Sequence, residues 1–255
     1  MTRIIAVTNQ KGGVGKTTTA VNLGAALALE GSPTLLIDLD PQASMTSSLG
    51  QDPYQLELDI KSVLTSSEVP MHRATMRIER NLYLLPGSVA LPGGPLAEDE
   101  PPVIEQGRLR HLLYRYRLPF DFVLIDTPPT LGQLTLNALV AAGEILVPVQ
   151  CQYLAMRGVR ALFEKVRRLR QEANPQLALT GVVATMFEPG SQHDEEVVAE
   201  LRATLGAERV RAIIERETSV AEATVAGRPL VHLYPNSSAT QAYRSLAKEL
   251  RNERF

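Results

Sequence analysis

Residues 9–19 read Asn-Gln-Lys-Gly-Gly-Val-Gly-Lys-Thr-Thr-Thr and are the most informative part of the chain. The apolar run 3–8 before them predicts a buried strand, and residues 16–30 predict a helix that ends before Gly31. A glycine-rich turn between a strand and a helix is the setting of a phosphate-binding loop. The glycines let the backbone turn tightly and aim its N–H groups inward, while the helix N-terminus adds a positive dipole end. The stretch therefore predicts a loop that binds the phosphates of a nucleotide.

The side chains of this loop have predicted roles. Lys16 would neutralise the β- and γ-phosphates, the Thr17 hydroxyl would ligate Mg²⁺, and Thr18 could reach the α-phosphate. Further nucleotide contacts are expected from Lys11, Gly12, Gly13, Val14 and Gly15. The usual pattern, G-x-x-x-x-G-K-[ST], begins with a glycine where this chain has Gln10, and it lacks the extra lysine at position 11.

Alternating strands and helices extend from the loop along the rest of the chain. Apolar strands are expected at residues 34–38, 82–85, 120–126, 144–150 and 179–185. Helices are expected at residues 131–142, 156–173, 195–205 and 239–253. Strands that are apolar on both faces and alternate with helices indicate an α/β fold with a mainly parallel sheet covered on both sides. We expect one three-layer α/β/α domain over residues 1–255, with 44–80 and 86–102 as surface segments of unassigned function.

Three aspartates are placed to complete a nucleotide site. Asp126 ends the apolar strand 120–126, where a carboxylate needs partners, and it is predicted to hold Mg²⁺ directly or through water. Asp38 and Asp40 follow the strand 34–38 and share a face if that strand continues, which suits a Mg²⁺-linked site. The alternatives are a strand-end cap for Asp126 and an ordinary polar loop for the other two.

Composition narrows the class of protein. The chain has 255 residues, a net charge of −2 and one cysteine, Cys151, so an intrachain disulfide or a cysteine-rich metal cluster is excluded. The apolar run 4–7 is too short for a signal-peptide core, and no stretch approaches the roughly 20 apolar residues of a membrane span. We expect a soluble, cytoplasmic protein whose net charge alone does not indicate nucleic-acid binding.

The string Lys-Gly-Gly-Val-Gly-Lys-Thr-Thr at 11–18 resembles the deviant Walker A motif of the ParA/MinD group of P-loop ATPases. The resemblance continues through the following four stretches: residues 36–42, 123–129, 137–139 and 147–150. It covers the chain from residue 3 to about residue 187, with a looser match beyond. The Asp-Pro-Gln at 40–42 is most similar to partition ATPases of the ParA/Soj type.

The resemblance implies a nucleotide-driven cycle. Lys11 would reach across an ATP-bound homodimer to the partner's nucleotide, Asp40 would position the hydrolytic water, and Asp38 would support the metal shell. ATP is favoured over GTP, also because the guanine-reading string Asn-Lys-x-Asp is absent. By position in the family, residues 186–187 and 214–220 would lie near adenine.

The resemblance also implies two partners. ParA/Soj ATPases bind DNA nonspecifically as ATP dimers through basic C-terminal residues, and a ParB-type centromere-binding protein stimulates their hydrolysis. This chain departs from that pattern, because Gly190 and Ser219 stand where relatives often have arginine, and Glu215 and Glu217 flank the remaining Arg216. Other basic candidates are Arg157, Arg160, Lys165, Arg167, Arg168, Arg202, Arg209, Arg211, Arg228, Arg244, Lys248, Arg251 and Arg254.

Two other classes stay open. The chain could be a nucleotide-gated positioning or regulatory ATPase that acts without DNA, or a metabolic enzyme of the same superfamily such as a ligase-type synthetase. A MinD-like membrane helix is not expected, because the helix 239–253 reads as a packing helix and few residues follow it. We expect no membrane partner, and a location at the nucleoid if the protein binds DNA.

Overall fold

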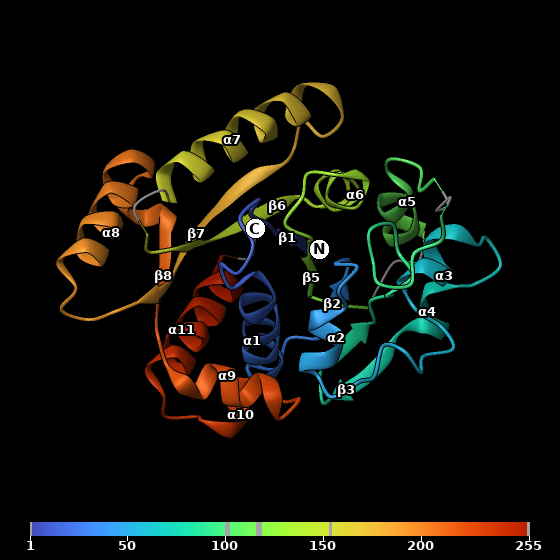
Figure 1. Ribbon diagram of the computed structural model, residues 1–255, viewed down its shortest axis with the longest axis horizontal. Helices are drawn as coiled ribbons and strands as arrows, with labels where there is room; N and C mark the ends of the chain where they lie inside the picture. The colour runs from blue at the N-terminus through green and yellow to red at the C-terminus, as the bar shows by residue number, and fades with distance from the viewer. Residues whose placement is uncertain (1, 100–102, 116–118, 153–154, 254–255) are drawn as a thin grey trace.

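The structure is a computed structural model that describes residues 2–99, 103–115, 119–152 and 155–253 (Figure 1). One eight-stranded sheet forms its centre, with the strand order β3-β4-β2-β5-β1-β6-β7-β8. The strands are β1 (Arg3–Val7), β2 (Thr34–Asp38), β3 (Met76–Glu79), β4 (Leu82–Leu85), β5 (Phe122–Asp126), β6 (Glu144–Gln150), β7 (Ala178–Phe187) and β8 (Val210–Glu215). Neighbouring strands pair in parallel except β3 with β4. The predicted α/β class with a mainly parallel sheet is confirmed.

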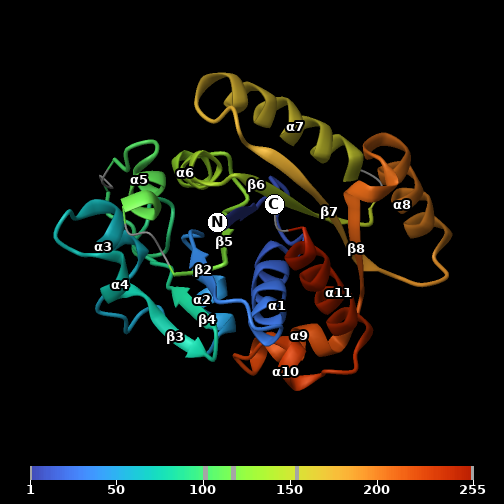
Figure 2. The ribbon, with the colours of Figure 1, turned by 180° about the vertical axis from the view of Figure 1, so that it is seen from behind.

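Helices cover both faces of the sheet, as the two opposite views show (Figures 1 and 2). The helices are α1 (Lys16–Leu29), α2 (Ser44–Ser48), α3 (Ile60–Thr65), α4 (Met71–Ala74), α5 (Arg108–Arg115), α6 (Gln133–Ala141), α7 (Ala155–Glu172), α8 (Gln192–Leu205), the 3₁₀ turn η1 (Ala207–Arg209), α9 (Thr218–Val225), α10 (Leu230–Leu233) and α11 (Ser238–Asn252).

The two layers of core follow the alternation of side chains along the central strands. Ile5 and Leu36 belong to a core beneath α1 and α11, whereas their chain neighbours Ala6 and Ile37 belong to a second core beneath α5 to α8. Every residue of β2 and β5 is buried, as the apolar sequence of these strands predicts. Tyr243, Leu246 and Leu250 of α11 face inward as expected.

The two segments expected at the surface contribute to the core, so that expectation was wrong in part. Residues 44–80 contain α2, α3, α4 and β3, and they bury Met45, Ile60 and Met71 completely. In the segment 86–102, Leu91 is also fully buried. These elements have four to six residues each, which is too short for a hydrophobic period to be visible. Among the described residues, no helix is long and apolar enough to span a membrane.

Candidate functional site

The phosphate loop lies where β1 ends and α1 begins, at the carboxyl edge of the sheet. Gly13 and Gly15 have φ angles of 71° and 84°, a left-handed conformation that glycine adopts at little steric cost. A Cβ at Gly12 or Gly13 would meet no atom within 4 Å, so this side of the loop is open. Inside, the Thr185 hydroxyl of β7 donates to the Val14 carbonyl at 2.8 Å and fixes the loop to the sheet.

Lys16 and Thr17 begin α1 beneath this open loop. Lys16 is 7% exposed, and its ammonium donates to the Lys11 carbonyl at 3.3 Å. Burial lowers the pKa of Lys16, while the Asp126 and Asp40 carboxylates oppose that shift. The first turn of α1 carries no acidic residue, so its positive dipole end is free to attract phosphate.

Asp126 meets Thr17 at the end of β5. The Thr17 hydroxyl donates to Asp126 Oδ2 at 2.6 Å, whereas Asp126 Oδ1 is buried without a partner among the described residues. Burial, then the nearby Asp38, raises the pKa of Asp126 well above its usual range, against the opposing effect of the Thr17 bond. An unpartnered carboxylate oxygen beside a hydroxyl suits Mg²⁺, which takes oxygen ligands and keeps few protein contacts.

Asp38 lies opposite Asp126 in the β2–β5 register and is fully buried. Its Oδ2 accepts hydrogen bonds from the Thr46 amide at 2.9 Å and the Thr46 hydroxyl at 2.7 Å, and its Oδ1 accepts one from the Asp40 amide at 3.3 Å. Burial raises the pKa of Asp38 to about 6. The structure therefore gives both oxygens protein donors, and the predicted support of a metal shell stays a prediction.

Thr46 and Gly87, from the two segments without an assigned function, pack around Asp38. The Gly87 amide donates to the Thr46 hydroxyl at 2.8 Å, and a Cβ on Gly87 would lie 2.7 Å from Asp38 Cγ. Sequence analysis missed both residues. The position of Gly87, two residues after the end of β4, could have indicated its place near Asp38. The carboxyl ends of the parallel strands β2 and β4 lie at the same edge of the sheet.

Asp40 lies beyond the end of β2, because the strand stops at Asp38 and does not continue through both residues. Asp40 is 9% exposed, and its Oδ1 accepts a hydrogen bond from the Gln42 amide at 2.9 Å. The turn holds the carboxylate close enough to Lys16 to act on the pKa of that ammonium. The predicted water-positioning role is compatible with this placement and stays a prediction.

Lys11 is exposed at the rim of the loop. Its amide donates to Asn9 Oδ1 at 3.1 Å, and its ammonium donates to Gln152 Oε1 at 2.5 Å. Lys16 therefore lies inside the loop, whereas Lys11 faces outward from it.

Among the described residues, no group of three or more His, Cys, Asp or Glu side chains could hold a metal ion. Mg²⁺ in phosphoryl-transfer sites is commonly held by one or two protein oxygens together with the substrate phosphates. Thr17 and Asp126 supply such a pair.

Comparison with known proteins fits this geometry. Residues 2–179 match the model of an AAA domain family. The chain is 36% identical over 250 residues to the sporulation initiation inhibitor protein Soj of Bacillus subtilis, covering 98% of both chains. It is 37% identical over 260 residues to the chromosome-partitioning ATPase Soj of Treponema pallidum, covering 98% of this chain and 97% of that one. The chain belongs to the ParA/Soj family of P-loop ATPases.

Solved structures of other P-loop proteins share the fold of this ParA/Soj member. One described as cobyrinic acid a,c-diamide synthase of Mycobacterium smegmatis, with bound ADP and magnesium, has a TM-score of 0.79 and 35% identity, covering 99% of this chain and 95% of that one. The cell division ATPase MinD of Pyrococcus furiosus has a TM-score of 0.82 and 26% identity, covering 99% of both chains. As a ParA/Soj member, the chain is an ATPase that uses ATP with Mg²⁺, as the sequence predicted.

The segments predicted near adenine and DNA have local structural roles in this ParA/Soj member. Glu217 accepts hydrogen bonds from the Ser219 hydroxyl at 2.7 Å, the Ser238 hydroxyl at 2.8 Å and the Ala239 amide at 3.0 Å. Although burial opposes it, these bonds lower the pKa of Glu217. Glu217 thus stays ionised and binds the first turn of α11, and Met186 has a positive φ of 54° at the end of β7.

The predicted basic residues divide into two groups. Arg211, Arg244 and Arg251 form ion pairs with glutamates, and Arg209 donates to the Leu179 carbonyl. The second group is exposed and has no ion pair within the part of the chain that the structure describes: Arg160, Lys165, Arg167 and Arg168 on α7, and Arg202, Arg216, Arg228 and Lys248 elsewhere. Arg254 and the side chain of Arg157 lie outside the described residues. The described part of α7 therefore carries several exposed basic side chains without an ion pair, together with the exposed acidic residues Glu164 and Glu172.

Proposed function

We propose that this chain is a ParA/Soj partition ATPase whose ATP-bound homodimer binds DNA nonspecifically and is reset by hydrolysis. The observation that carries the proposal is the exposed Lys11 at the open side of the glycine loop. The ammonium of a lysine that faces away from its own nucleotide site can pair with a phosphate of the nucleotide bound by a second chain. The Lys11–Gln152 bond is solvent-exposed and therefore weak enough for such a phosphate to displace.

Within one site we assign four residues to ATP. Lys16 binds the β- and γ-phosphates, and Thr17 with Asp126 holds Mg²⁺, which neutralises charge on the transferring phosphoryl group. Asp40 orients the attacking water. Asp38 positions Asp40. Its oxygens accept hydrogen bonds from the Thr46 hydroxyl and the Asp40 amide, and these bonds fix the turn that carries Asp40. Backbone N–H groups of residues 11–18 complete the phosphate contacts.

For DNA we assign the exposed face of α7. Arg160, Arg167 and Arg168 are spaced to gather on one side of a helix, and each is exposed. Nonspecific binding requires clustered cations against phosphates and no base readers. A ParB-type protein would stimulate hydrolysis, and binding to DNA would place the protein at the nucleoid. We further infer that residues 1–255 act as one domain, since all strands of the described residues pair in one sheet.

The dimer is tested by light scattering of the purified protein with ATP and with ADP. We expect the wild type to dimerise with ATP alone, and Lys11→Ala to bind ATP yet stay monomeric. A stable ATP dimer of Lys11→Ala would remove the cross-site role of this lysine.

The DNA surface is tested with Asp40→Ala protein, which we expect to remain an ATP dimer, on random-sequence duplex across a salt series. Adding Arg160→Gln, Arg167→Gln and Arg168→Gln should weaken binding and reduce the salt slope by about two to three. The matched control adds Arg73→Gln, Arg77→Gln and Arg80→Gln, which removes equal charge from the opposite end of the sheet. Equal loss in both sets would refute the assignment to α7.

A second candidate is a nucleotide-gated positioning ATPase that acts on protein cargo without DNA. It is favoured by Ser219, which is bonded to Glu217 in place of a phosphate-binding cation. An ATP dimer that ignores DNA at every salt concentration would support this candidate.

A further inference from the structure

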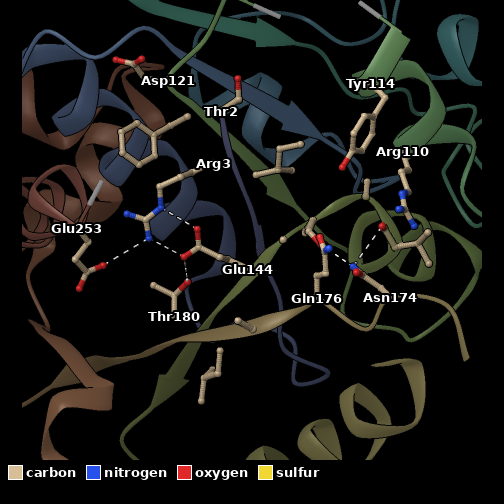
Figure 3. Close-up of a pocket in the computed structure, with 18 of the residues that line it drawn as sticks. Thr2, Arg3, Arg110, Tyr114, Asp121, Glu144, Asn174, Gln176, Thr180 and Glu253 are labelled. Carbon is tan, nitrogen blue, oxygen red and sulfur yellow. Dashed lines mark hydrogen bonds and ion pairs between the residues drawn. The ribbon is translucent and has the colours of Figure 1, made fainter. Parts of the chain in front are cut away.

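A cavity of about 700 Å³ opens at the edge of the sheet opposite the phosphate loop (Figure 3). Its lining includes the first residues of β1, β5, β6, β7 and β8, whereas the loop follows the end of β1. These five strands are neighbours in the sheet. At about 4.8 Å between strands, four intervals give a groove about 19 Å long.

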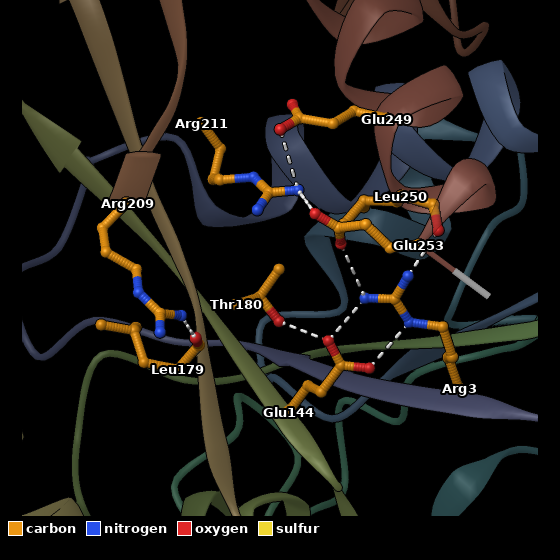
Figure 4. Close-up of polar contacts among 9 residues, drawn as sticks. All are labelled: Arg3, Glu144, Leu179, Thr180, Arg209, Arg211, Glu249, Leu250 and Glu253. Carbon is orange, nitrogen blue, oxygen red and sulfur yellow. Dashed lines mark hydrogen bonds and ion pairs between the residues drawn. The ribbon is translucent and has the colours of Figure 1, made fainter. Parts of the chain in front are cut away.

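The acidic groups of the groove are engaged in internal pairs (Figure 4). Arg3 donates to both oxygens of Glu144, at 2.8 and 2.6 Å, and the Thr180 hydroxyl donates to Glu144 at 2.7 Å. Although burial opposes it, the Arg3 bond lowers the pKa of Glu144, which stays ionised. Glu253 pairs with Arg3 and Arg211. Asp121 at the rim has an interaction of its own as well.

A glycine makes room for two arginines at the β8 end. Gly181 has a φ of 158°, and a Cβ there would lie 2.3 Å from Arg211 Cγ and 2.6 Å from the Arg209 carbonyl oxygen. The Arg211 side chain, 9% exposed, therefore lies over Gly181, and its buried Nε has no acceptor among the described residues. Arg209 is exposed and donates to the Leu179 carbonyl, which leaves most of its guanidinium donors unused.

The opposite end of the groove also has a free cation. The Arg110 guanidinium lies 5.7 Å from the centre of the Tyr114 ring, and it has no ion pair or hydrogen bond within the described part of the chain. Tyr114 is 67% exposed. Between the two ends, the wall is formed by small residues: Ala141, Ala142, Gly143 and Ala178. The groove thus offers at each end one arginine without an ion pair among the described residues, Arg110 and Arg209, and between them small residues beside polar groups that already have internal partners.

We propose that this groove binds an extended acidic peptide segment of a partner protein. A strand-like segment advances about 3.3 Å per residue, so about six residues span the groove. Its carboxylates pair with Arg110 at one end and with Arg209 at the other. Duplex DNA fits poorly, because its phosphate oxygens would find no cationic partner along the small residues Ala141 and Ala178.

The test uses a fluorescent six-residue peptide of alternating glutamate and alanine, blocked at both ends, and full-length protein without nucleotide. We expect anisotropy to report binding at low salt, and the same peptide with lysine in place of glutamate not to bind. Arg110→Gln and Arg209→Gln should each weaken binding about two- to fivefold. Arg80→Gln, which removes one exposed charge from the turn between β3 and β4, is the matched control and should have no effect.

A charge-swap pair at one position sharpens the test. Ala178 is exposed in the groove, so Ala178→Glu should weaken binding and Ala178→Lys should strengthen it, with ATP binding unchanged in both. Absence of binding by the wild type, or equal binding by all variants, would overturn the proposal. Displacement of the peptide by succinate or inorganic phosphate at equal concentration would also overturn it, in favour of a small anion.

Discussion

Replacement of Gly87 by alanine tests the corner behind the hydrolytic turn. The new methyl group would lie 2.7 Å from Asp38 Cγ and Oδ2 and 3.1 Å from Ala43 Cα, so carboxylate or backbone must move. Such overpacking costs about 1–3 kcal/mol. For a chain of this size, a loss of about 2 kcal/mol lowers Tm by about 4–8 °C. The displaced turn carries Asp40, so ATP hydrolysis should also fall while ATP binding persists.

Gly158→Ala is the matched control for this substitution. Gly158 lies inside α7, and a Cβ there would meet no atom within 4 Å. The same change should therefore stabilise the protein by about 0.5–1 kcal/mol, because alanine is the better helix former. Thermal unfolding followed by circular dichroism and steady-state phosphate release are the two assays. A Gly87→Ala protein with wild-type Tm and wild-type turnover would refute the close contact between Gly87 and Asp38.

Three further predictions concern the site and its surroundings. Lys16→Ala should abolish ATP binding measured by calorimetry, and retained tight binding would refute the phosphate-loop role of this ammonium. Asp40→Ala should bind ATP and accumulate as a dimer without releasing phosphate, so monomers at saturating ATP would contradict its role. Burial raises the pKa of Cys151 from 9.0 to about 12, so at pH 8 its thiolate is about a thousandfold rarer than in the unfolded chain. Alkylation of Cys151 by iodoacetamide, measured by mass spectrometry, should therefore be slow until denaturant is added.

Local sequence predicted the phosphate loop and the central strands well, because both depend on short-range patterns. Glycines and lysine must occupy adjacent positions to form the loop, and strands buried on both faces read as unbroken apolar runs. Residues 9–19 and β2 illustrate the two cases.

The partners of Asp38 illustrate what sequence patterns do not contain. Thr46 lies in a five-residue helix eight positions after Asp38. Gly87 follows β4, 49 positions after Asp38, so the pairing of β2 with β4 is needed to bring it there. The strand β8 was missed for a different reason. All but one of its six residues are only partly buried at the edge of the sheet, so its apolar pattern is weak.

The position of β1 between β5 and β6 has a consequence for synthesis of the chain on the ribosome. Arg3 pairs in register with Phe122, and Ile5 pairs with Glu144, so the strand that precedes the phosphate loop does not have both neighbours until residue 144 has been translated. The Arg3 guanidinium then meets the Leu250 carbonyl in the last helix. A nascent chain therefore exposes its nucleotide motif before β5 and β6, the two strands that hold β1 in the sheet, have been synthesised.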